Sequence, residues 1–384
     1  MGNRTSSSIE DYTSHHDGDG EDKKEDVQQA KKNEPAKPKL VYVFDSNKDA
    51  SPPNTPRRVT KLMGNIVIGV FIVTWISSIL SPILLGVAIY HECNIIATFI
   101  VLISIVAYLP WNRNNIPICN YIRDDIISYY HLRLYSSTRI IFIEKQQEDE
   151  KEVHETKKNP TFYGIHPHGA FCLGWSILFC HEIMENVKFC FAPILYYSPF
   201  FRLFSRITGT PGSASKTSLM MYMKQHKVDI ALPPGGFEEA TLTSTSQDRV
   251  FLHNRKGFIK LCLKYGYNIR PTYVFGEKYT YWNVQGYWKL RLLLNKYNIP
   301  TIFTWGKFFF PLLPKTNDNV HLTIVVGPTI SVPVGGIEHP TKDDVHVYHT
   351  KYVNAIQNLF ETYKDLAYDS DPKYDSKTCK LEIW

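Results

Sequence analysis

Two histidines flanking a proline are the side chains in this sequence best suited to chemistry. His166 and His168 lie in the stretch FYGIHPHGAF, where an apolar run typical of a buried strand precedes them. Pro167 stiffens the backbone between the two rings, and Gly169 follows directly. Three interpretations compete: a pair of metal ligands, a catalytic base with a helper, or two hydrogen-bonded histidines in a tight turn.

The metal interpretation requires ligands that the rest of the chain does not supply. Such sites need further histidines and an aspartate at later strand ends. The later predicted strands VDIAL, IRPTYVF and HLTIVV end without His or Asp, and His321 begins its strand. We therefore expect no metal. A purely structural pair would leave the motifs further along the chain unexplained.

The catalytic interpretation needs one neutral imidazole beside an alcohol. The ordinary pKa of histidine, near ~6.5, suits it to accept a proton while an alcohol attacks an activated acyl group. Such a base also needs a carboxylate that orients its second nitrogen. A basic site is needed as well if the acyl donor is coenzyme A, whose phosphates are anionic.

Two stretches further along the chain offer such groups. PPGGFEEA, residues 233–240, is a glycine turn after a strand and carries Glu238 and Glu239. HNRKGF places Arg255 and Lys256 at a predicted helix start, where free backbone N–H groups favour phosphate. Cys172 is a conceivable thiolate nucleophile, but its apolar surroundings favour an inert buried thiol.

The order of these motifs resembles the type-2 diacylglycerol acyltransferase family, which includes monoacylglycerol and wax-alcohol acyltransferases. The resemblance rests on HPHG, GG-x-x-E, NRKGFIKL, VFGE and VVGPTISVP, over roughly residues 160–335. It implies an acyltransferase of the endoplasmic reticulum membrane with access to lipid droplets. Such an enzyme esterifies diacylglycerol with fatty acyl-CoA as co-substrate, without a bound cofactor; monoacylglycerol or a long-chain alcohol is the alternative acceptor. A non-catalytic lipid-binding protein that keeps the fold is the alternative from another class.

The resemblance also implies roles for individual residues. His168 is the expected general base, and His166 and Glu239 complete the catalytic set. Pro167 and Gly169 shape the turn, and Gly169 is expected to let a helix begin there, so that its free N–H groups stabilise the oxyanion. Two further sets are implied: Arg255, Lys256 and Gly257 for acyl-CoA, and Gly235 and Gly236 for the acceptor.

The elements that position these residues follow a mixed α/β pattern from about residue 116. Strands are predicted at 160–165, 187–197, 228–232, 269–276 and 321–327, and helices at 169–185, 198–209, 213–227, 255–266 and 343–366. Strands alternating with helices predict a largely parallel sheet flanked by helices; with the resemblance, the fold expected is glycerolipid-acyltransferase-like. The aromatic and basic segment 282–298 fits either a membrane interface or ordinary core.

Two uncharged runs precede this domain, at residues 65–90 and 95–111. The first exceeds the ~20 residues that cross a bilayer, and the second nearly reaches that length. Basic residues flank the pair on its outer sides, and the link HECN has no Lys or Arg. The positive-inside rule therefore predicts a membrane hairpin within 57–115, either transmembrane or re-entrant, with both termini in the cytosol. The third segment, 116–384, is the acyltransferase domain.

Residues 1–56 are predicted to be a disordered polar tail. They hold 8 Lys and Arg against 11 Asp and Glu, whereas the rest of the chain holds 35 against 26. The basic balance fits membrane lipids or a phosphorylated substrate; no nucleic-acid-binding pattern is present, and self-association is left open. Seven cysteines without CxxC spacing fit reduced thiols. MGNRTS matches the myristoylation pattern at Gly2.

Overall fold

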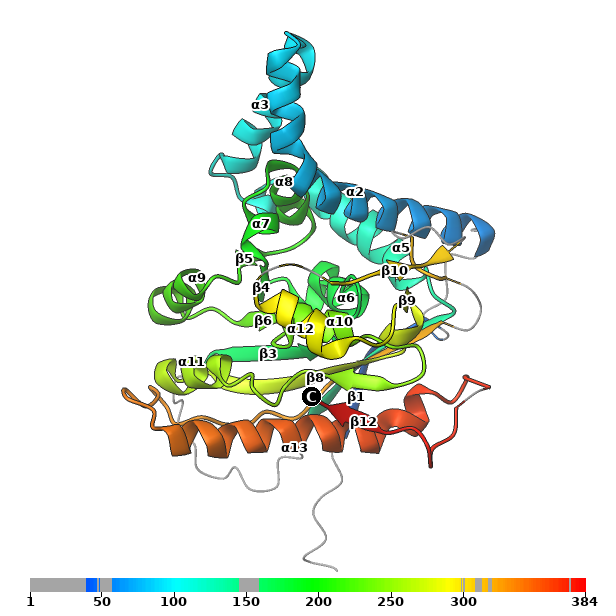
Figure 1. The fold of residues 1–384 in the computed structure, drawn as a ribbon, viewed down its shortest axis with the longest axis vertical. Helices are drawn as coiled ribbons and strands as arrows, with labels where there is room; N and C mark the ends of the chain where they lie inside the picture. The colour runs from blue at the N-terminus through cyan, green and yellow to red at the C-terminus, as the bar shows by residue number, and fades with distance from the viewer. Residues whose placement is uncertain are drawn as a thin grey trace, which may run out of the picture.

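The computed structural model describes residues 39–46, 48, 57–144, 159–297, 299, 301–307, 313–316, 320–372 and 374–384. The predictions made for Gly2, for most of the N-terminal tail and for the acidic insertion at 145–158 lie outside these residues. Within the described part of the chain, a mixed sheet forms the centre of the molecule and helices cover both of its faces (Figure 1).

The predicted sheet is confirmed, and it is largely parallel. Its strand order is β1-β2-β11-β8-β3-β6-β4-β5. Within this eight-stranded sheet, as far as the structure describes it, the β1–β2 and β11–β8 pairs are antiparallel and the others are parallel. The strands are β1 (Lys39–Asp45), β2 (Ser137–Glu144), β3 (Thr161–His166), β4 (Lys188–Phe191), β5 (Pro211–Ser213), β6 (Ile230–Leu232), β8 (Asn268–Phe275) and β11 (His321–Val326). Small ribbons pair β7 (Asp248–Val250) with β12 (Leu381–Ile383) and β9 (Trp282–Asn283) with β10 (Thr304–Trp305).

Side chains alternate between two cores, one on each face of the sheet. On β8, Tyr273 and Phe275 pack into one core, whereas Val274 packs into the other. The first core lies against α11 (Gly257–Tyr265) and the long closing helix α13 (Lys342–Ala367), at the bottom of Figure 1. The second lies against the helices at the top of that view.

The remaining helices lie mostly on this second side. They are α2 (Arg57–Tyr90), α3 (Asn94–Tyr108), α4 (Pro117–Tyr121), a π-helical segment (Ile122–Ser128), α5 (Tyr129–Leu132), α6 (Leu173–Cys180), α7 (Pro193–Tyr196), α8 (Pro199–Thr208), α9 (Lys216–Met221), α10 (Gly236–Leu242) and α12 (Trp288–Lys296). Ser215 caps α9 by accepting a hydrogen bond from the Ser218 amide, as expected for a serine before a helix.

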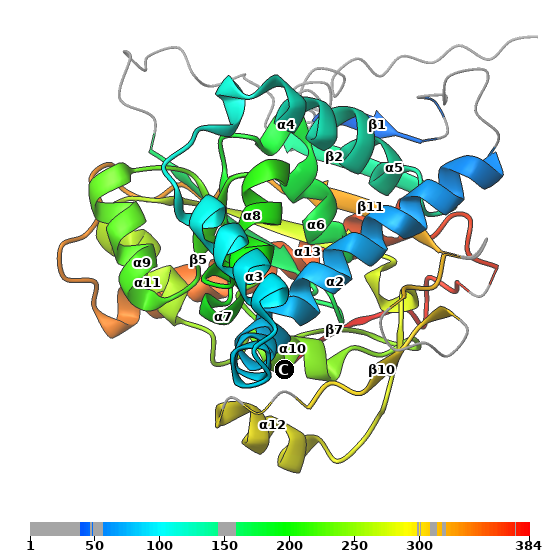
Figure 2. The same cartoon turned by 90° about the horizontal axis from the view of Figure 1, so that it is seen from above.

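α2 combines two structural roles because it bends. Its first half packs on α5 and α8, and beyond the bend it runs beside α3, away from the domain (Figures 1 and 2). Pro82 removes one backbone hydrogen bond near the bend. Thr74 and Ser78 also bond to carbonyls one turn earlier.

By length and composition, one helical stretch of the described chain can cross a membrane, Arg57–Ser78. The Leu80–Tyr90 and Asn94–Tyr108 stretches are apolar but shorter. Exposed side chains cover this projecting pair: Ile83, Leu84, Val87, Ile89, Ile95, Ile96, Phe99, Leu102 and Ile105. The helices are therefore placed as a hairpin, but the part that projects is shorter than the predicted runs.

Three local predictions are wrong. Residues 39–45 form β1, paired with β2, instead of belonging to the polar tail, because the apolar run LVYVF completes the edge of the sheet. Residues 193–196 form α7 instead of extending β4, because Pro193 suits the first turn of a helix. The helix expected from Gly169 begins only at Leu173.

α12 is not ordinary core. Leu290 and Leu293 are exposed, whereas Arg291 is buried and donates hydrogen bonds to the Thr301 carbonyl at 3.1 and 2.7 Å. An exposed apolar helix face of this kind is typical of a membrane interface.

Candidate active site

The HPHG turn lies at the centre of the sheet, at the carboxyl end of β3. β3 runs parallel to β6 on one side and to β8 on the other. Ligands of open α/β sheets bind at such strand ends. His166 is the last residue of β3, so the strand itself fixes the direction of its side chain.

His166 lies behind the turn and is fully buried. Its Nδ1 lies 3.0 and 2.9 Å from the two carboxylate oxygens of Glu239, and its Nε2 lies 3.1 Å from the Tyr352 hydroxyl of α13. Neither His166 nor Glu239 is more than 1% exposed. Since both ring nitrogens have partners inside the protein, His166 holds the turn against α10 and α13 and does not reach a substrate.

Glu239 fastens the backbone of the turn. Its Oε1 accepts from the His168 amide at 2.6 Å, and its Oε2 accepts from the Phe251 amide at 2.8 Å. Gly235 makes this possible, because a Cβ there would lie 2.1 Å from Oε2 of Glu239. The carboxylate therefore contacts the His168 backbone, not its ring. The carboxylate expected to orient the ring of the base therefore binds the ring of His166 instead, and it acts on His168 through the backbone.

His168 carries the less deeply buried ring of the pair. Its Nδ1 lies 2.9 Å from the Gly169 carbonyl, which can only accept a hydrogen bond. Nδ1 therefore carries the proton, and Nε2 keeps a lone pair. Burial lowers the pKa of His168 and outweighs the Gly169 carbonyl and the Glu239 charge, which act in the opposite direction. The ring is thus neutral at pH 7, as a general base must be.

The ring of His168 lines a small apolar cavity of about 120 Å³. Several elements contribute to its wall. Phe71 and Trp75 come from α2, Phe191 from β4, Leu195 from α7, Phe201 from α8, and Phe237 from α10. The helix α2 thus forms part of the cavity wall. An apolar cavity with one imidazole on its wall, beside the thiols of Cys172 and Cys190, suits an acyl chain next to a base.

Cys172 lies beside the base, with its Sγ 3.2 and 3.4 Å from the two ring nitrogens of His168. Burial raises the thiol pKa well above its usual value, and the charges of Glu277 and Glu239 raise it further. A protonated thiol is a poor nucleophile, so the geometry does not favour an acyl-enzyme at Cys172. Within the described residues, no three His, Cys, Asp or Glu side chains gather as metal ligands.

Glu277 is a group of the site that sequence reasoning missed, although it belongs to the VFGE motif. It follows β8 and is 1% exposed. Its carboxylate accepts from the Leu173 and Gly174 amides at 3.0 and 2.8 Å. Burial raises the pKa of Glu277 to about 7, against the opposing effect of these two amides.

The position of Glu277 corrects the role expected for the start of α6. The first free N–H groups of α6 already donate to the Glu277 carboxylate, so they are not available to an oxyanion. Gly169 has φ +62°, and a Cβ there would lie 2.3 Å from Oε1 of Glu277. Gly169 is needed for this close approach and for its left-handed backbone, not for starting the helix.

The expected acyl-CoA residues lie next to the turn that holds Glu239. Arg255 pairs with Glu238 and donates to the Gly235 carbonyl at 3.1 Å. Lys256 is exposed, and Gly257 begins α11, as predicted. The peptide of Gly236 lies beside the Arg255 guanidinium, since a Cβ there would be 3.5 Å from Nη2. The chain therefore brings the three motifs together, with Arg255 already ion-paired.

Comparison with known proteins gives consistent results. The family model described as diacylglycerol acyltransferase matches residues 99–377. Diacylglycerol O-acyltransferase 2 of Rattus norvegicus is 32% identical over 228 residues, 53% of this chain and 56% of that protein. Its counterpart from Danio rerio is 29% identical over 225 residues, 53% of this chain and 60% of that protein. 2-Acylglycerol O-acyltransferase 3 of Homo sapiens is 30% identical over 223 residues, 53% of this chain and 64% of that protein. The matches thus cover less than two thirds of each relative, and no solved structure matches.

Proposed function

Because this chain belongs to the type-2 diacylglycerol acyltransferase family, we propose that it transfers a fatty acyl group from acyl-CoA to diacylglycerol. The product is triacylglycerol. The observation that carries the proposal is the neutral His168 ring, with an unprotonated Nε2, on the wall of an apolar cavity. The similarity to 2-acylglycerol O-acyltransferase 3 supports monoacylglycerol as a second candidate acceptor.

The transfer proceeds directly, without an acyl-enzyme. The acceptor hydroxyl oxygen attacks the thioester carbonyl while Nε2 of His168 takes its proton. The tetrahedral intermediate collapses, the C–S bond breaks, and the imidazolium returns the proton to the leaving thiolate of coenzyme A. His166, Glu239 and Pro167 position the base, since His166 and Glu239 are buried behind it.

Binding of the two substrates is assigned to the neighbouring motifs. Arg255 and Lys256, at the start of α11, bind the coenzyme A phosphates, and Gly257 leaves room for them, because no atom lies within 4 Å of a Cβ placed there. Gly235 and Gly236 border the acceptor. An Arg255 that binds phosphate must exchange its pairing with Glu238 for the ligand.

The site must open before a lipid enters it. A cavity of about 120 Å³ is smaller than the ~300–1,000 Å³ of ordinary ligand pockets. The α2 wall lies close to the bend, because Trp75 is within one turn of Ser78, so a movement of the projecting half can displace it. We place the hairpin in the endoplasmic reticulum membrane, with both termini in the cytosol and access to lipid droplets.

The decisive experiment uses microsomes from cells that lack neutral-lipid synthesis. Microsomes with the full chain receive labelled acyl-CoA and, in turn, diacylglycerol, monoacylglycerol and a long-chain alcohol. We expect triacylglycerol as the main product. No ester from any acceptor would refute the proposal and leave the lipid-binding alternative, whereas preferred acylation of another acceptor would change the substrate assignment.

Variants of the two histidines test the mechanism. His168→Ala should lower turnover by about 10²–10⁴-fold while the protein accumulates normally, because a positioned base is lost. Cys172→Ala is the matched control, since it removes the neighbouring side chain without the base, and should retain turnover. Activity in His168→Ala near that of the unaltered chain would show that another group is the base.

A further inference from the structure

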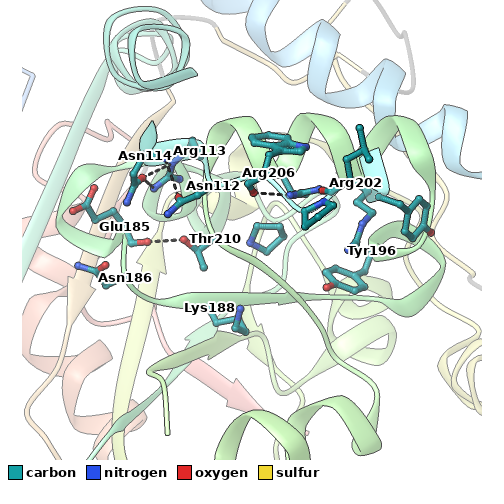
Figure 3. A pocket seen from close by; sticks show the side chains of 16 residues that line it. Asn112, Arg113, Asn114, Glu185, Asn186, Lys188, Tyr196, Arg202, Arg206 and Thr210 are labelled. Atoms are coloured by element: carbon teal, nitrogen blue, oxygen red, sulfur yellow. Dashed lines mark hydrogen bonds between the residues drawn. The ribbon is translucent and has the colours of Figure 1, made fainter. Parts of the chain in front are cut away.

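A second, basic pocket lies at the foot of α3, apart from the cavity of His168. It has a volume of about 470 Å³ (Figure 3). Its lining includes Arg113, Lys188, Arg202 and Arg206, with Glu185 as its acidic member. Four basic side chains against one acid give the pocket a positive potential, which attracts an anion.

The acid in this pocket is already paired outside the lining. Oε2 of Glu185 lies 3.2 Å from Nη1 of Arg123, a residue that also pairs with Asp124. Glu185 also opposes the lowering of the Arg113 pKa by burial, but one acid shared with Arg123 leaves the other three basic side chains of the lining without an acidic partner in that lining. The pocket retains a surplus of positive charge.

Arg113, on the wall of this pocket, has one hydrogen-bond donor that is not satisfied. The residue is 7% exposed, and its Nη1 is buried without a hydrogen-bond partner. Its Nε and Nη2 lie 3.3 and 3.2 Å from the side-chain oxygen of Asn114, a neutral acceptor. Burial lowers the pKa of Arg113, and the nearby Arg123 charge lowers it further. A buried guanidinium with a free donor is costly unless an anion completes it.

The two arginines of α8 place the pocket at the carboxyl end of α3. Arg202 donates to the Ala107 carbonyl at 3.1 Å, and Arg206 donates to the Ala107, Leu109 and Trp111 carbonyls at 2.7, 2.9 and 2.7 Å. They therefore occupy the carboxyl end of α3, where positive charge is favourable. The guanidinium of Arg206 also lies 4.1 Å from the centre of the Trp111 ring.

The side chains along α3 indicate where the pocket lies relative to a membrane. Exposed apolar side chains such as Phe99 and Leu102 cover the helix up to Tyr108. Tyr108 and Trp111 then line the pocket itself. Aromatic residues followed by basic ones at the end of an apolar helix mark the interface where lipid headgroups lie.

We propose that this pocket binds the phosphate of an anionic phospholipid headgroup. Arg113 and Lys188 are its main ligands, and the acyl chains of the lipid lie along α3. Charge-assisted bonds to phosphate complete the Arg113 guanidinium. The inference goes beyond the acyl transfer and does not depend on it, because the site is formed by other residues of β4, α7 and α8 than those that line the His168 cavity.

The phosphate of coenzyme A is the competing source of the same chemistry. The full chain is purified in a neutral detergent, and its thermal unfolding midpoint is measured with dioctanoyl phosphatidic acid, dioctanoyl phosphatidylcholine or coenzyme A. A ligand that binds the folded state raises the midpoint. We expect phosphatidic acid to raise the midpoint more than the other two, whereas a larger rise with coenzyme A that Lys188→Ala abolishes would overturn the lipid assignment.

Variants locate the effect. Lys188→Ala removes a half-buried ligand that otherwise lies over the Tyr222 ring, and Arg113→Gln replaces the guanidinium by a shorter, uncharged polar side chain. Each should weaken phosphatidic acid binding about ten- to a hundredfold. Lys351→Ala, an exposed cation on α13, is the charge-matched control and should not change binding. Unchanged binding in Lys188→Ala and Arg113→Gln, or equal loss in Lys351→Ala, would refute the site.

Discussion

Replacing Glu239 by glutamine tests the account of the turn with a minimal change. The two side chains have nearly the same shape, but a glutamine has one oxygen where the carboxylate has two. In the native site, Oε1 accepts from the His168 amide and Oε2 from the Phe251 amide. Either orientation of a glutamine therefore sets its NH₂ group against one backbone N–H. The imidazole of His166 can adapt by changing tautomer, but the backbone donors cannot.

The magnitude follows from that single unsatisfied donor. A buried N–H without an acceptor costs about 1–3 kcal/mol. Moving the His168 backbone by about 1 Å is enough to lower turnover by about 10²-fold. We expect Glu239→Gln to lower the Tm of the detergent-purified chain by a few degrees and to lose most turnover with any acceptor.

The neighbouring residue supplies the matched control. Glu238→Gln makes the same chemical change one residue earlier, where the carboxylate only pairs with the partly exposed Arg255. Such a pair contributes less than about 1 kcal/mol, so Tm should hardly change. A Glu239→Gln chain with native Tm and turnover would refute the reasoning. An equal fall of Tm in Glu238→Gln would attribute the effect to local charge instead.

Three further predictions concern other groups of the site. The raised pKa of Glu277, about 7 in the folded chain against 4.5, means that stability falls as pH rises from about 4.5 to 7, by about 3 kcal/mol. Melting curves of Glu277→Gln should lose this dependence; a persistent slope would assign it to another group. Arg255→Ala should raise KM for acyl-CoA and change kcat little, whereas a pure kcat effect would place the phosphates elsewhere. Trp75→Ala enlarges the cavity and should alter the acyl-chain preference in competition assays. An unchanged preference would show that the cavity holds no acyl chain.

The sequence placed the turn and named His168 as the base, but it did not show which groups hold the turn in place. HPHG was correctly placed at a strand end, next to the glycine turn and the start of α11. The alternation of side chains along β3 also indicates which histidine is buried, because Phe162, Gly164 and His166 share one face of the sheet. A Cβ at Gly164 would lie 2.0 Å from the Tyr352 hydroxyl, so this face meets α13. Counting from Phe162 would have predicted a buried His166 and left His168 as the less deeply buried ring.

Other features depended on contacts that no local pattern specifies. Glu277 belongs to the VFGE motif, yet its partners Leu173 and Gly174 are about 100 residues away in the chain. Tyr352 is one of several apolar-face residues of α13, and only packing distinguishes it. β1 was missed because five apolar residues within a polar tail do not show that an edge of the sheet is open to them.

The wall that α2 contributes has a practical consequence for anyone seeking a water-soluble form of this protein. Phe71 and Trp75 lie in the same helix that leads into the projecting hairpin, and they belong to the cavity beside His168. A chain that starts at residue 116 would lack this part of the wall. Its apolar cavity would then be exposed to water, which promotes aggregation. A better cut removes only the residues beyond the bend, from about Leu80 to Tyr108, and joins the ends with a short polar linker.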